Sequence, residues 1–146
     1  MGLPGNGLVK RKVDGRAFAQ LLREMVPAGE SALVMVEQVR VMGGKNNAVQ
    51  TQGSLMRTLG ALEAVLEVLR MPPTMLEPQT WKRFYGLGSD KKASLELARR
   101  LYPTAVLHLA KHHNRAEAVL LAHYGLRKHM DEAAKHDKHD ELFGAF

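Results

Sequence analysis

The feature that most constrains the fold is a continuous apolar run over residues 32–36, which ends at the acidic residue Glu37. A run without polar alternation is typical of a strand that is covered on both faces, as in α/β proteins. It is far too short to span a bilayer, which takes about 20 apolar residues in a helix. We therefore expect a buried strand over residues 32–37 with a carboxylate at its carboxyl end.

Two helices are expected to flank this strand in the sequence. The first covers residues 15–25, because Asp14 is a suitable N-cap and apolar residues then recur at helical spacing. The second covers about residues 47–70, where the Pro72–Pro73 pair prevents its continuation. Its apolar stripe, at steps of three and four, consists of Leu55, Leu59, Leu62, Leu66 and Leu69.

The second half of the chain repeats the alternation of strand and helix. We expect a short strand over 74–77, a helical turn over 81–85, a helix over 91–101 capped by Ser89 or Asp90, and a last helix from about Asn114 to Gly125. This order predicts an α/β fold. Residues 1–13 are expected to form a flexible or edge segment, 14–127 one domain, and 128–146 a polar, fraying tail rich in His, Asp and Lys.

Composition narrows the class of protein. The absence of cysteine excludes disulfides and thiolate metal sites and fits a reducing compartment. The N-terminus lacks the apolar core of a signal peptide, so we expect a cytoplasmic protein with no membrane partner. A net charge of +6 favours polyanionic partners, chiefly nucleic acid, because phosphate contacts release counterions.

Four short segments then occur in a characteristic order: Val36–Val39, Glu77–Lys82, Ser89–Ala93 and His112–Ala118. In this order and spacing they resemble the RuvC-like Holliday junction resolvases of phages and prophages, which belong to the RNase H-like nucleases. The resemblance covers roughly residues 14–127. It implies an RNase H-like three-layer α/β fold and Mg²⁺-dependent hydrolysis of branched or duplex DNA, with Mn²⁺ as an alternative ion, in a bacterial host cell.

The same resemblance assigns a catalytic set. Glu37 and Glu117 match the acidic metal ligands of the family, whereas the residues alone would favour a solvated strand-end glutamate for Glu37. His113 and Asn114 stand where another acidic residue is usual, and both share the helical face of Glu117. His113 would act as a ligand or proton carrier. Asn114 is also a plausible N-cap.

Three basic residues match family positions that meet DNA: Lys82, Lys91 and Arg115. A lysine suits a single phosphate oxygen, although the alternative for each residue is a solvated helix face. Trp81, next to Lys82, is interpreted as a core residue rather than a base-stacking platform.

One part of the family pattern has no match, namely the first strands and the aspartate that the first of them carries. The expected sheet is therefore N-terminally incomplete, and its open edge at residues 33–36 predicts a homodimer. The missing aspartate predicts weak or absent cleavage. The alternative function is a non-catalytic, basic DNA-binding or protein-interaction module on an RNase H-like remnant.

Overall fold

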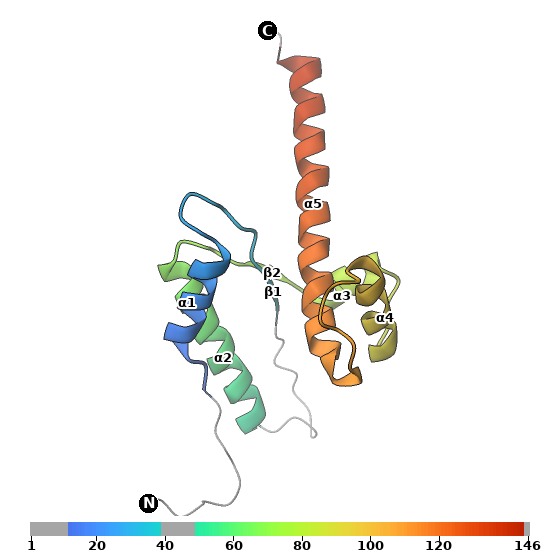
Figure 1. Cartoon of the computed structure of the whole chain (residues 1–146). Helices are drawn as coiled ribbons and strands as arrows, with labels where there is room; N and C mark the ends of the chain where they lie inside the picture. The colour runs from blue at the N-terminus through green and yellow to red at the C-terminus, as the bar shows by residue number, and fades with distance from the viewer. Residues whose placement is uncertain (1–11, 39–48, 145–146) are drawn as a thin grey trace, which may run out of the picture. The chain divides into compact units, whose positions relative to one another are not determined.

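The computed structural model describes residues 12–38 and 49–144, which belong to two compact units (Figure 1). The first unit comprises residues 1–32 and 39–72, and the second comprises 33–38 and 73–146. Most of the segment expected over 1–13 lies outside the described residues. The single domain expected over 14–127 stays a prediction.

Two helices form the described part of the first unit, α1 (Gly15–Met25) and α2 (Val49–Val68). The predicted cap of α1 is confirmed, because the carboxylate of Asp14 accepts a hydrogen bond of 3.1 Å from the Ala17 backbone N–H. The predicted long helix is also confirmed, with each end two residues inside the expected range of 47–70. After α2 the chain turns at Arg70, whose φ of 58° lies in the left-handed region.

The second unit contains the sheet, which joins β1 (Met35–Glu37) and β2 (Thr74–Leu76) in parallel. Glu37 is in register with Leu76, so both strands end at the same edge. The chain is mixed α/β, which agrees with the predicted class, and it is mostly helical; the RNase H-like fold stays a prediction. The expected strand over 32–37 begins three residues later than predicted.

Three helices and one helical turn complete the second unit. They are α3 (Pro78–Phe84), α4 (Lys91–Leu101), the 3-10 turn η1 (Ala110–His112) and α5 (His113–Phe143). Pro78 occupies the first turn of α3. A backbone N–H at this position has no hydrogen-bond acceptor within the helix, so proline, which lacks the N–H, is tolerated there. Asp90 caps α4 through a 2.9 Å hydrogen bond from the Lys92 backbone N–H. The predicted N-cap Asn114 is wrong, because α5 already begins at His113.

The core of this unit lies between α3, α4 and the first half of α5. Its buried residues are Trp81, Leu95, Ala98, Leu107, Ala116, Leu120, Leu121 and Tyr124. Trp81 is fully buried, which confirms its interpretation as a core residue. The strand β1 approaches α5 at Gly125, where an added Cβ would lie only 2.6 Å from Cγ of Met35. The contact favours glycine at this position, because an added Cβ would force the Met35 side chain to shift.

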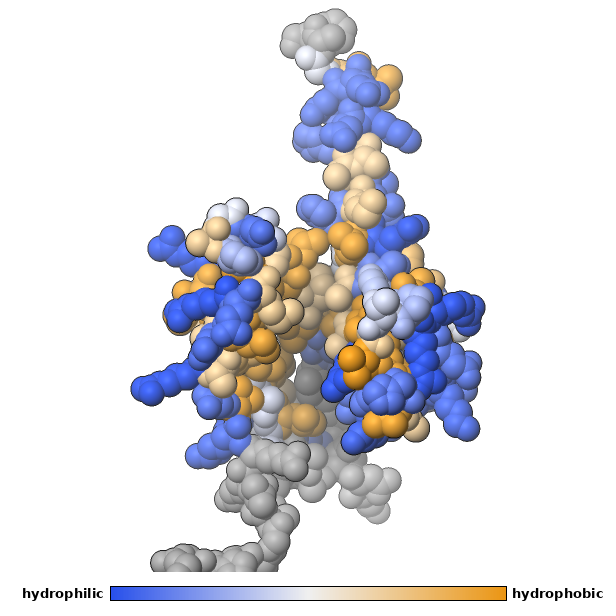
Figure 2. Space-filling view, in the orientation of Figure 1, coloured by the Kyte–Doolittle hydropathy of each residue, from blue (hydrophilic) through white to orange (hydrophobic). Residues whose placement is uncertain are grey.

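The last helix was expected to end near Gly125, and that prediction is wrong. The helix α5 has 31 residues in all and ends at Phe143, and its second half extends beyond α3 and α4 (Figure 1). Figure 2 shows that the visible face of this second half is mainly hydrophilic. Residues 126–143 contain no proline and are rich in helix-forming Ala, Glu, Lys and Leu, with opposite charges four residues apart, as in Lys128 and Glu132. Within the described residues, no helix combines the length and apolar character needed to cross a membrane.

Candidate functional site

Glu37 is the last residue of β1, as the apolar run predicts. The strand pairing continues one step beyond it, because the Gln38 backbone N–H donates to the Leu76 carbonyl at 2.7 Å. The backbone at Glu37 is therefore held by its pairing with β2. The side chain of Glu37 is half-buried. This is the edge of a parallel sheet at which ligands of α/β proteins usually gather.

Two further elements bring charged side chains to this strand end. Glu117 lies on α5 between the buried residues Ala116 and Leu120, which anchor that turn of the helix in the core. Lys82 lies on α3, directly after the buried Trp81. Lys82 Nζ is 3.9 Å from Glu117 Oε1, and these side chains are 28% and 24% exposed. An ion pair at this distance and exposure can open at little cost.

The electrostatics show that Glu37 shares this cluster. Burial raises the pKa of Glu37, and the neighbouring Glu117 carboxylate raises it further. Lys82 and the Trp81 side chain act in the opposite direction and favour the charged form. A half-buried carboxylate with a second carboxylate beside it forms an environment that a cation would stabilise.

Trp81 adds an unsatisfied donor to the cluster. Its indole Nε1 is buried and has no hydrogen-bond partner among the described residues. The indole is nevertheless close enough to Glu37 to lower the pKa of that carboxyl. The indole of Trp81 thus lies near the Glu37 carboxylate, but the two groups do not meet the distance and angle of a hydrogen bond. Buried donors without a partner are uncommon in folded proteins.

The donor chemistry fits one hydrated divalent cation. Glu37 and Glu117 offer hard oxygen atoms, and Mg²⁺ commonly binds proteins through one or two carboxylates while water and substrate phosphates fill its other positions. Over residues 12–38 and 49–144, no group of three or more His, Asp or Glu side chains could hold a metal. The structure does not bring His113 into such a group. His113 is half-buried, one helical turn before Glu117.

Of the three predicted basic residues, Lys82 is the one that the structure brings to the acidic pair. Lys91 is the exposed first residue of α4. Arg115 is exposed too, and its Nη1 donates to the Val106 carbonyl at 2.9 Å. That bond gives Arg115 a structural role, which is to hold the segment that leads into α5.

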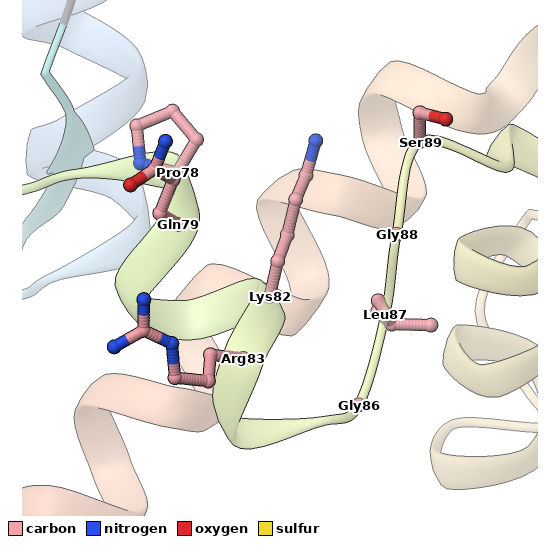
Figure 3. A pocket seen from close by; sticks show the side chains of 8 residues that line it. All are labelled: Pro78, Gln79, Lys82, Arg83, Gly86, Leu87, Gly88 and Ser89. Atoms are coloured by element: carbon pink, nitrogen blue, oxygen red, sulfur yellow. The ribbon is translucent and has the colours of Figure 1, made fainter.

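A groove of about 540 Å³ opens on the same face of α3 as Lys82 (Figure 3). It lies between α3 and the segment that follows, and it is lined by Pro78, Gln79, Lys82, Arg83, Gly86, Leu87, Gly88 and Ser89. Lys82 extends between α3 and that segment in Figure 3. Gly86 has a φ of 66°, a conformation that favours glycine and turns the chain back along α3.

The sequence patterns did not indicate this groove. Its detectable signal was Pro78 and Lys82, four residues apart on one face of a helix, followed by the turn residues Gly86 and Gly88. Two cations, a side-chain amide and a hydroxyl line it, and these groups suit a series of phosphates.

The amino-acid sequence matches no known family model and no curated protein sequence.

Proposed function

We propose that the protein is a metal-dependent endonuclease for branched DNA, of the RuvC-like, RNase H-like type that its sequence motifs resemble. The observation that carries this proposal is the convergence of Glu37, from the end of a parallel strand, with Glu117, from the last helix. Strand-end and helix carboxylates in one half-buried cluster are the ligands that phosphodiester hydrolysis with Mg²⁺ requires. The net charge of +6 agrees with a polyanionic substrate.

Each residue of the cluster has a role in this proposal. Glu37 and Glu117 would hold one Mg²⁺ or Mn²⁺, and the ion would supply activation of water and stabilisation of negative charge on the phosphate. Burial, and then the neighbouring Glu117 carboxylate, raise the pKa of Glu37, and a cation between the two carboxylates would offset both effects. Lys82 leaves its partly exposed pair with Glu117 and contacts a phosphate oxygen instead. His113, one helical turn before Glu117, is the proposed proton carrier.

The groove beside Lys82 extends this site along the DNA backbone. Arg83 and Gln79 would contact phosphates that flank the cleaved one, together with the Ser89 hydroxyl on the opposite side of the groove. Such contacts position a nucleic acid without reading its sequence, as a structure-selective enzyme requires. Lys91 and Arg115 would contribute at longer range through charge alone.

The test is nicking of a four-way DNA junction with Mg²⁺ or Mn²⁺. Glu37→Gln keeps the size of the side chain and removes its charge. The matched control is Glu96→Gln, which changes an exposed glutamate of α4. We expect Glu37→Gln to lower the cleavage rate by more than roughly 100-fold, because loss of an outer-shell partner of a metal ligand alone can cost that much. The control should cleave like the wild type. Equal cleavage by Glu37→Gln and the wild type would refute the proposal.

A second candidate is a non-catalytic, basic module that binds DNA or a protein. It is favoured by the Lys82–Glu117 ion pair, which neutralises one carboxylate, and by the lack of a three-ligand group in the described part of the chain. This candidate predicts junction binding that weakens with salt and is indifferent to metal. Binding without any metal-dependent cleavage would favour it over the nuclease.

A further inference from the structure

Trp81 is the single tryptophan of the chain and has a property that core packing does not explain. The residue is 0% exposed, yet its Nε1 has no hydrogen-bond partner among the described residues. Phenylalanine would supply an apolar ring at the same place without burying an unpaired donor. A buried N–H without a partner indicates an acceptor that reaches it in another state of the site.

The neighbourhood restricts which group that acceptor is. Lys82 is the next residue and can only donate. The Glu117 carboxylate already lies 3.9 Å from Lys82. The Glu37 carboxylate interacts with the Trp81 indole, and its backbone is held by the sheet while its side chain remains half-buried. Glu37 is therefore the carboxylate that we assign as the acceptor.

We propose that Trp81 is a positioning residue of the acidic cluster: its buried indole N–H donates to one carboxylate oxygen of Glu37 and leaves the other oxygen for the cation shared with Glu117. This inference rests on the proposed function, because it assumes that Glu37 binds a cation. A carboxylate accepts several hydrogen bonds, so the indole and a cation do not compete for the same lone pair. Partners of this kind orient a ligand and raise its affinity for metal.

The single tryptophan makes the contact directly measurable, because the ¹H–¹⁵N spectrum of the full chain contains one indole cross-peak. We would record that peak without metal in the wild type, in Glu37→Gln and in Glu117→Gln. A hydrogen bond to a carboxylate moves an indole proton downfield, so Glu37→Gln is expected to move it upfield. Glu117→Gln, at the other carboxylate of the cluster, is expected to shift it less.

Magnesium titration of the same samples tests the positioning role. We expect the wild-type indole peak to shift saturably with Mg²⁺, and Trp81→Phe to bind Mg²⁺ about 10- to 100-fold more weakly by calorimetry. Glu37→Gln leaves Trp81 in place, so a folding defect in Trp81→Phe does not prevent the test. An indole peak that shifts no more in Glu37→Gln than in Glu117→Gln would overturn the inference. A Glu37-dependent peak without any response to Mg²⁺ would support the contact and refute the metal site.

Discussion

Gly125 is the point at which α5 touches the strand that carries Glu37. A Cβ at this position would lie 2.6 Å from both Cγ and Sδ of Met35, whereas real Cβ contacts essentially never fall below 3.0 Å. Gly125→Ala therefore forces the Met35 side chain, two residues before Glu37, to move. Gly60 on α2 provides a matched control, because nothing lies within 4 Å of an added Cβ there.

Two opposing effects set the magnitude. Glycine to alanine inside a helix stabilises it by about 1 kcal/mol, and overpacking of a core costs about 1–3 kcal/mol. We expect Gly60→Ala to raise the free energy of unfolding by up to about 1 kcal/mol. Gly125→Ala should instead lower it by about 0–2 kcal/mol, the difference between the two effects. In a Met35→Ala background the clash is gone, so Gly125→Ala should become stabilising by about 1 kcal/mol.

Urea unfolding of the wild type, Gly125→Ala, Met35→Ala and the double variant gives the coupling free energy between Gly125 and Met35. The expected coupling is about 1–3 kcal/mol, within the range for residues in contact. If Gly125→Ala stabilises the wild type as much as Gly60→Ala does, β1 does not pack against α5 at Gly125.

The remaining predictions concern the cluster, the groove and the sheet edge. Because burial and Glu117 raise the pKa of Glu37 above 4.5, the folded state disfavours its charged form, and this penalty grows as the pH rises through the folded pKa. Glu37→Gln should therefore melt at a higher temperature than the wild type at neutral pH, and the difference should vanish below pH 4.5; a constant difference would contradict the assigned cause. For the groove, Arg83→Gln should lower the salt slope of junction binding by about one, whereas Arg100→Gln on α4 should not, as measured by fluorescence anisotropy. Among the described residues no strand pairs with the outer edge of β1, so we expect a homodimer in sedimentation velocity, and a monodisperse monomer would refute it.

Local signals in the sequence predicted most of the helices. Asp14 and Asp90 cap α1 and α4 as their side-chain chemistry requires, and these interactions involve residues only two or three positions away. The end of α5 was mispredicted because Gly125 has the usual identity of a helix stop. Its actual reason is a contact with Met35, which is 90 residues earlier and leaves no local trace.

The same distinction applies to the candidate site. Glu37 could be predicted because an apolar strand ends at it, and Glu117 because it interrupts an apolar helix. That Lys82 pairs with Glu117, and that Trp81 buries an unpaired donor beside Glu37, depends on how three elements pack. The groove along α3 could not be predicted because its second wall is the segment around Gly88. The turn at Gly86 brings this segment back beside α3, and the sequence does not show the direction of that turn.

The central claim is that Glu37 and Glu117 form one divalent-cation site, and Mn²⁺ binding followed by electron paramagnetic resonance tests it most directly. We predict saturable Mn²⁺ binding by the wild type that Mg²⁺ displaces, and a large loss of affinity in both Glu37→Gln and Glu117→Gln, because each removes a charged oxygen ligand. The Glu96→Gln control should bind as the wild type does. Unchanged Mn²⁺ affinity in either cluster variant would contradict the claim.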